Sequence, residues 1–156
     1  MRTLLVLGKV WPEPTASAAG SRILQLIEAF KTDGWQVKLG CAAKRPEHHF
    51  SLSNIGVEEV EIELNNSSFD TFLEELSPDA VMFDQFMTEE QFGWRVAKIC
   101  PDAFRILDTE DLHCLRSARK KALDENRPFI SGDLLTEESA KREFASIYRC
   151  DLSLII

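Results

Sequence analysis

The sequence predicts an α/β protein in which a mostly parallel sheet of about six strands lies between two layers of helices. Short apolar runs recur along the chain, which is typical of strands covered on both faces. Segments with a helical spacing of apolar residues separate these runs. The 156 residues, 44% hydrophobic and 28% charged, suffice for one domain with its own core. Together these observations predict a three-layer, Rossmann-like fold with right-handed crossovers.

The expected strands follow one another at regular intervals. The first is a continuous apolar run that ends at Gly8. The third carries glutamates at alternate positions, which indicates that one face of this strand is exposed to solvent and that the strand lies near the edge of the sheet. The polar stretch 44–56, which contains His48 and His49, is expected to be a loop. The full set of expected strands is 3–8, 36–42, 57–64, 80–84, 104–108 and 151–156.

Helices are expected between the strands, with the usual start and stop signals. Ser21 is the expected N-cap of the first helix, and Gly34 ends it. Thr88 is the expected cap of the third helix, whose first turn holds acids that the helix dipole favours. The later helices are expected at residues 70–76, 88–100, 113–125 and 134–148, with 126–133 as a loop.

The last expected strand ends in Leu154-Ile155-Ile156, an apolar run that normally continues into a loop carrying function. We therefore expect residues 1–156 to be one domain of a longer protein that has been truncated. The alternative is a natural end in a docked terminal strand.

Charge and cysteine usage bear on partners and compartment. The formal net charge of −8 argues against nucleic acid as a partner, because phosphate binding depends on Lys and Arg. The basic run 116–121 is either a local phosphate site or a solvated helix face. The four cysteines show no zinc spacing, and Cys41 and Cys150 lie in apolar surroundings, which indicates a reducing, cytoplasmic setting. No apolar run approaches the roughly 18 residues of a transmembrane segment, and the first residues do not form a signal peptide.

Ligands of an open parallel sheet bind beyond the carboxyl ends of its strands, where the strand order reverses. Gly20, Ser21 and Arg22 follow the first strand, and small residues at a helix start let backbone amides approach a ligand. The alternative is that Gly20 only clears a tight turn. Asp84 ends the fourth strand, and it either orients a ligand hydroxyl or caps the next turn.

The segment after the fifth strand is the richest in chemistry. Asp108, Glu110 and Asp111 place three carboxylates beside His113, and we expect these carboxylates to contact the substrate. His113 is the expected catalytic residue, because a histidine titrates near neutral pH and acids favour its charged form. The alternatives are helix capping by the acids and a structural histidine. No metal is expected, because the segment lacks a defined ligand spacing.

Several common site motifs are absent. The chain has neither GxGxxG nor GxxxxGK[ST], which disfavours nicotinamide and ATP sites of the usual kinds. The GxSxG elbow of serine hydrolases is missing too. Phosphorelay receivers place a pair of acids after the first strand, where this chain has Gly8-Lys9-Val10.

The sequence resembles the N-terminal domain of GT-B glycosyltransferases, close to bacterial family-4-like members. Three segments carry the resemblance: the first strand with its long loop and Gly20-Ser21-Arg22, the strand in 78–84, and residues 107–113. Residues 86–94 are also similar to a bacterial subgroup of predicted glycosyltransferases. The resemblance covers nearly the whole chain.

The resemblance implies two Rossmann-like domains facing a cleft, and transfer of a sugar from a nucleotide-sugar donor to a glycan or small-molecule acceptor without a metal or other cofactor. The N-terminal domain mainly receives the acceptor, and the absent C-terminal domain binds the donor. Gly20 corresponds by position to the loop near the donor phosphates, and His113 to a histidine near the transferred sugar. The sequence departs from the family in Ala19-Gly20, where two glycines are usual, and in Glu110-Asp111 ahead of the histidine.

Two other functions stay open. One is a non-catalytic Rossmann-like binding or regulatory domain that recognises a protein partner, which an acidic surface fits. The other is a nucleotide-sugar epimerase of the same architecture, in which carboxylates and His113 perform acid–base chemistry. If the chain is part of a glycosyltransferase, residues 1–156 alone are expected to be inactive, because the donor half is absent.

Overall fold

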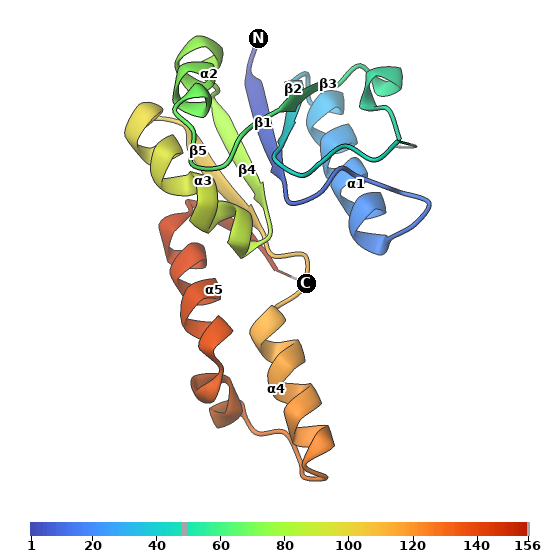
Figure 1. The fold of residues 1–156 in the computed structure, drawn as a ribbon, viewed down its shortest axis with the longest axis vertical. Helices are drawn as coiled ribbons and strands as arrows, with labels where there is room; N and C mark the ends of the chain where they lie inside the picture. The colour runs from blue at the N-terminus through green and yellow to red at the C-terminus, as the bar shows by residue number, and fades with distance from the viewer. Residues whose placement is uncertain (48–49, 156) are drawn as a thin grey trace.

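The computed structural model describes residues 1–47 and 50–155, and it confirms a three-layer, Rossmann-like α/β/α fold (Figure 1). Its single sheet has six parallel strands in the order β3-β2-β1-β4-β5-β6. The predicted edge position of the third strand is therefore correct. The strands are β1 (Thr3–Gly8), β2 (Gln36–Cys41), β3 (Glu58–Glu61), β4 (Ala80–Asp84), β5 (Phe104–Asp108) and β6 (Leu152–Leu154).

Helices connect every pair of successive strands except β2 and β3, between which a short 3₁₀ helix lies. The predicted loop 44–56 contains that 3₁₀ helix, while His48 and His49 lie outside the described residues, as does Ile156 at the end of the last predicted strand. The helices are α1 (Ala18–Thr32), α2 (Ser68–Leu76), α3 (Phe86–Ile99), α4 (His113–Asp124) and α5 (Glu138–Arg149), with 3₁₀ helices η1 (Leu52–Ile55) and η2 (Ser131–Thr136).

Two predicted helix caps are wrong. Ser17, not Ser21, caps α1, because the Ser17 Oγ accepts a hydrogen bond from Gly20 N at 3.0 Å. The Ser21 side chain instead donates to the Pro14 carbonyl oxygen at 2.8 Å. Thr88 lies inside α3, which already begins at Phe86, and it is buried. Both helices therefore start earlier than predicted, α1 directly after Ser17 and α3 directly after Gln85.

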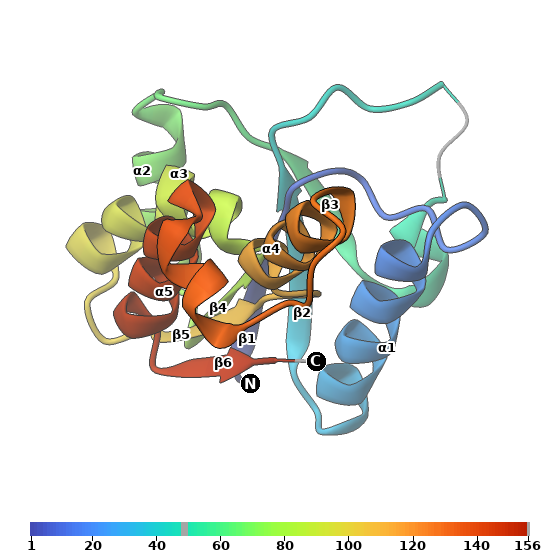
Figure 2. The same ribbon diagram turned by 90° about the horizontal axis from the view of Figure 1, so that it is seen from below.

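Alternate residues of the central strand β1 belong to two separate hydrophobic cores, one on each face of the sheet. Leu4 and Val6 pack with Ile27 of α1 on one face of the sheet. Leu5 and Leu7 face the opposite side, where α2 and α3 cover the sheet and α5 lies beside them. Figure 2 shows α1 on one side of the sheet and α2, α3 and α5 on the other. The continuous apolar run of β1 is thus explained by burial on both faces.

The antiparallel pair of α4 and α5 extends beyond the sheet, joined by η2 (Figure 1). Its two helices are linked at one end by Glu143, whose side chain is fully buried. The Glu143 carboxylate accepts hydrogen bonds from the backbone N–H groups of His113 and Cys114, both at 2.9 Å. A carboxylate on α5 therefore caps the N-terminus of α4, where the helix dipole favours negative charge.

No helix in the described part of the chain is long and apolar enough to cross a membrane. All four cysteines lie within the described residues and are free thiols. Both Cys41 and Cys150 were expected to be buried because of their apolar neighbours in the sequence; Cys41 is buried, whereas Cys150 is only partly buried.

Candidate functional site

The carboxyl ends of β1, β4 and β5 meet at one edge of the sheet. Asp84 and Asp108 are register partners at the ends of β4 and β5, and β1 ends beside them at Gly8. The strand order reverses between β1 and β4, which is where open α/β sheets bind ligands. The segments that contain the predicted site residues are therefore brought to one edge.

Arg22 and Asp108 hold α1 against β5 through a bidentate ion pair. Arg22 Nη2 lies 2.8 Å from Asp108 Oδ1, and Arg22 Nε lies 3.1 Å from both carboxylate oxygens. The Asp108 side chain is only 2% exposed. Its hydrogen bond with Arg22 raises the pKa of the guanidinium, which stays charged. Both groups are engaged with each other, so the pair fixes the geometry of the edge.

Asp84 is a partly buried carboxylate, and its surroundings differ from those of Asp108. Its Oδ2 accepts a hydrogen bond from Lys9 N at 3.3 Å, and no cation pairs with it among the described residues. Burial, together with the charges of Asp108 and Glu110, raises the pKa of Asp84 to about 6. The carboxyl group therefore exchanges its proton close to neutral pH, which is a property of functional sites as well as of structural ones.

Gln85 follows Asp84 in a backbone conformation that is almost restricted to glycine, with φ 68° and ψ 155°. Three contacts hold it there. Its backbone N–H donates to the Asp108 carbonyl oxygen at 2.8 Å, its Nε2 donates to Glu110 Oε2 at 2.6 Å, and its Oε1 accepts from Lys9 Nζ at 3.2 Å. Glu110 itself has a positive φ of 59°. Strained residues of this kind cluster at ligand sites.

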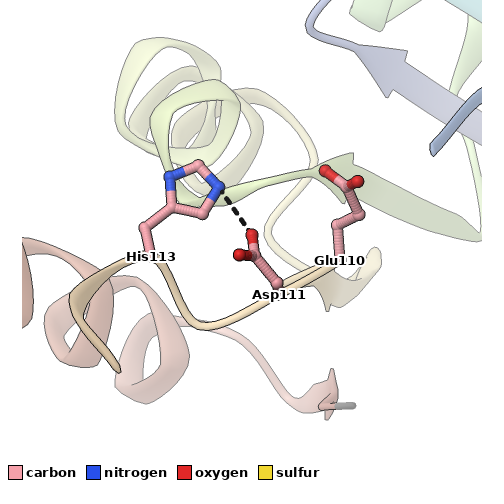
Figure 3. A group of neighbouring side chains, drawn as sticks. All are labelled: Glu110, Asp111 and His113. Carbon is pink, nitrogen blue, oxygen red and sulfur yellow. Dashed lines mark ion pairs between the residues drawn. The ribbon is translucent and has the colours of Figure 1, made fainter. Parts of the chain in front are cut away.

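His113 is the first residue of α4, and it lies against two different partners. Its ring contacts the Phe86 ring edge to face, with the centroids 5.5 Å apart. His113 Nε2 lies 3.1 Å from Asp111 Oδ1, an ion pair when the imidazole is protonated (Figure 3). The other Asp111 oxygen lies 2.6 Å from Arg116 Nη1. Asp111 thus lies between the imidazole of His113 and the guanidinium of Arg116.

The ligand atoms of Glu110, Asp111 and His113 lie within 4.8 Å of one another. One nitrogen and two carboxylate oxygens would suit a transition metal. The two carboxylates already have protein partners, since Glu110 accepts a hydrogen bond from Gln85 and Asp111 forms an ion pair with Arg116. A site without a metal stays our prediction.

Gly20 is required by the loop that precedes α1. A Cβ at this position would lie 2.5 Å from the Glu13 carbonyl oxygen, a distance that real side chains do not adopt. The Gly20 N–H is engaged by Ser17 Oγ. Gly20 therefore clears the close approach of the loop, and its predicted contact with a donor phosphate stays a prediction.

Sequence reasoning missed three residues of the site: Lys9, Gln85 and Glu143. The only sequence signal for the first two was their place directly after a buried strand. Glu143 lies 30 residues from His113 in the chain, and no pattern in the sequence joins them.

Comparison with known proteins shows the fold. No protein-family profile and no curated protein matches the sequence. An alpha-glucosyltransferase in complex with UDP and a 13-mer DNA containing a HMU base matches with a TM-score of 0.54 and 12% identity, over 98% of this chain and 37% of that one. Sucrose-phosphate synthase from Thermosynechococcus elongatus matches with a TM-score of 0.57 and 12% identity, over 100% of this chain and 48% of that one.

An alpha-glucosyltransferase in complex with UDP-glucose and DNA containing an abasic site gives a TM-score of 0.54 at 14% identity, over 99% of this chain and 35% of that one. Because two of these structures contain DNA, the absence of a nucleic-acid partner here stays a prediction. The chain spans less than half of the length of each of these proteins, and over that part it has the Rossmann-like fold of GT-B glycosyltransferases.

Proposed function

We propose that the chain is the N-terminal, acceptor-side part of a glycosyltransferase that moves a sugar from a nucleotide-sugar donor to an acceptor. The observation that carries this proposal is the likeness of nearly the whole chain to about a third to a half of known glycosyltransferases. The polar cluster at the carboxyl edge of β4 and β5 supports it, because this is the edge where such a sheet binds ligands. The donor then binds mainly to a second domain beyond residue 156.

His113 is the proposed catalytic residue of this part. The ring lies at the ligand edge, is fixed by Phe86 and Asp111, and stands at the N-terminus of α4. Its proposed role is to contact the transferred sugar while the bond to the leaving diphosphate breaks. Helix N-termini and basic side chains stabilise a leaving diphosphate without a metal. Gly20, Ser21 and Arg22 shape the neighbouring wall of the cleft.

The acceptor is proposed to be a glycan or a small molecule, not a nucleic acid. The chain carries 26 acidic and 18 basic residues, and its ligand edge holds four carboxylates, those of Asp84, Asp108, Glu110 and Asp111. A polyphosphate backbone would be repelled by this surface. A neutral hydroxyl-bearing acceptor would not.

The experiment compares His113→Ala with Lys120→Ala in the full-length parent. Lys120 lies on the exposed face of the same helix and serves as the matched control. Transfer from UDP- and GDP-sugars is measured together with thermal unfolding. We expect His113→Ala to lower kcat at least about tenfold, within the range of general catalytic contributions, with unfolding unchanged. An unchanged kcat would remove the proposed role of His113.

The 156-residue chain alone is expected to transfer no sugar. Its folded state is first checked by circular dichroism, and the same donors are then supplied with an acceptor mixture. Measurable transfer by this chain would refute the proposal that a second domain supplies the donor site.

A further inference from the structure

A cavity of about 380 Å³ lies beside the polar cluster, between the loop after β1 and the ends of β2 and β4. This volume is within the range of about 300–1,000 Å³ of small-molecule sites. Its walls are mostly apolar, with Trp11, Pro12 and Ile23 on the side of β1 and α1, and Ala43 and Pro46 after β2. Asp84 and Gln85 form one polar part of its lining, and Glu13, Ser17 and Lys44 are its other polar residues.

The walls of this cavity are held in place by the protein itself. Trp11 Nε1 donates to the Ala43 carbonyl oxygen at 2.8 Å, which joins the loop after β1 to the end of β2. The Arg45 guanidinium lies over the Trp11 ring, 4.0 Å from its centroid. Close contact between Gly20 and Glu13 seats the same loop on α1. A cavity with such fixed walls needs little rearrangement on binding, as is usual for small-molecule sites.

One polar group in the cavity lacks a full set of partners. Asp84 accepts its hydrogen bond through Oδ2, and no donor among the described residues reaches its Oδ1. The neighbouring amide of Gln85 is already engaged at both ends, by Glu110 and Lys9. A carboxylate oxygen accepts hydrogen bonds only, so a hydroxyl group in the cavity would add a donor to this oxygen. The cavity therefore has mostly apolar walls, with Glu13 and Lys44 also in its lining, and Asp84 Oδ1 is an acceptor that can take a further hydrogen bond.

We propose that this cavity binds the acceptor substrate, and that the acceptor is an uncharged molecule with a compact apolar body and a hydroxyl group that donates to Asp84. The inference rests on the proposed function and narrows its acceptor class. A fully polar sugar would leave most of its hydroxyls unpaired against Trp11, Pro12 and Ile23. An anion would face the carboxylates of Asp84 and Glu13 and those of the neighbouring Asp108 and Glu110, which outnumber the one lysine of the lining, Lys44.

The test is a titration of the 156-residue chain followed by ¹H–¹⁵N NMR. Three probes are used: cyclohexanol, methoxycyclohexane, which has the apolar body but no donor, and glucose, which has donors but no apolar body. Cyclohexanol is expected to shift the signals of the Trp11 indole N–H and the Gln85 amide. It should bind about tenfold more tightly than methoxycyclohexane, because only the alcohol donates to a charged acceptor. Glucose should cause no shift.

Two variants separate the hydroxyl contact from the apolar fit. Asp84→Ala should bind the alcohol and the ether equally, while Asp102→Ala, which removes an exposed carboxylate before β5, should keep the tenfold preference. The inference is overturned if cyclohexanol causes no shift, if glucose or UDP binds in this cavity, or if Asp84→Ala retains the preference.

Failure of this inference is distinguishable from failure of the proposed function. Cyclohexanol binding together with an inactive full-length parent would keep the cavity assignment and remove the transferase. Transfer by the parent to an acceptor that leaves Trp11 and Gln85 unperturbed would keep the transferase and remove the cavity as its acceptor site.

Discussion

Replacing Asp84 by asparagine is expected to stabilise the folded chain at neutral pH and to leave its stability at pH 4 unchanged. Burial is the largest reason why the pKa of Asp84 rises from 3.8 to about 6. A tenfold change in proton affinity corresponds to about 1.4 kcal/mol, so holding this carboxylate charged costs the folded state on the order of 3 kcal/mol above pH 6. Asparagine carries no charge and still offers an oxygen to Lys9 N.

The sign follows from proton binding. Between about pH 4 and pH 6 the folded chain holds the Asp84 proton and the unfolded chain releases it, so this group makes the stability fall as the pH rises. Below about pH 4 both states are protonated and the cost vanishes. We expect Asp84→Asn to raise the free energy of unfolding by about 1–3 kcal/mol at pH 8.

The assay is urea unfolding followed by circular dichroism from pH 4 to pH 8, with the difference between variant and wild type as the measured quantity. The other charged groups around Asp84, which include Lys9, Asp108, Glu110 and Arg22, are common to both proteins. The matched control is Asp102→Asn, which changes an exposed carboxylate. A difference that does not depend on pH, or a variant less stable than wild type at pH 8, would refute the electrostatic reasoning.

Three further predictions concern the supports of the site. Glu143→Gln should lower the free energy of unfolding by about 2–3 kcal/mol, because an amide accepts only one of the two backbone N–H groups at the start of α4. Urea unfolding against the exposed Glu138→Gln measures this, and equal stability of the two variants would contradict it. Gly20→Ala should cost about 1–3 kcal/mol through its clash with a loop carbonyl. Thermal unfolding beside Gly132→Ala, where a Cβ meets no close atom, is the comparison, and matching Tm values would disprove the clash. Burial raises the pKa of the Cys114 thiol to about 12, so iodoacetamide at pH 8 should leave it unmodified in the native chain, as read by mass spectrometry. Rapid labelling there would show that the thiol is accessible.

The sequence was most informative where burial alone determines structure. β4 and β5 have the predicted bounds, because residues 80–83 and 106–108 are buried and each strand ends at an aspartate. The helix starts were predicted less well. Ser21 and Thr88 carry the usual capping side chains, yet the caps depend on how each loop closes, which is a property of tertiary contacts.

The candidate site likewise has features that the sequence predicts and features that depend on tertiary contacts. The topological rule correctly predicts that the segments of Gly20, Asp84 and His113 meet at one edge, since parallel strands all end there. The conformation of Gln85 has no signal in the sequence, because glutamine rarely adopts such backbone angles. The hydrogen bond from the start of α4 to Glu143 likewise depends on how α5 packs, so the sequence alone does not predict it.

The strand order has a consequence for synthesis of the chain on the ribosome. β1 is enclosed between β2 and β4, and Leu4 pairs with Val37 on one side and with Ala80 on the other. The second partner lies some 76 residues downstream, as the bond from Thr3 N to Asp79 illustrates. At about 5–20 residues per second, β1 waits roughly 4–15 s with one edge unpaired. Pausing of translation before Ala80 prolongs that exposure, so slow codons or truncation within this interval should favour aggregation and chaperone binding.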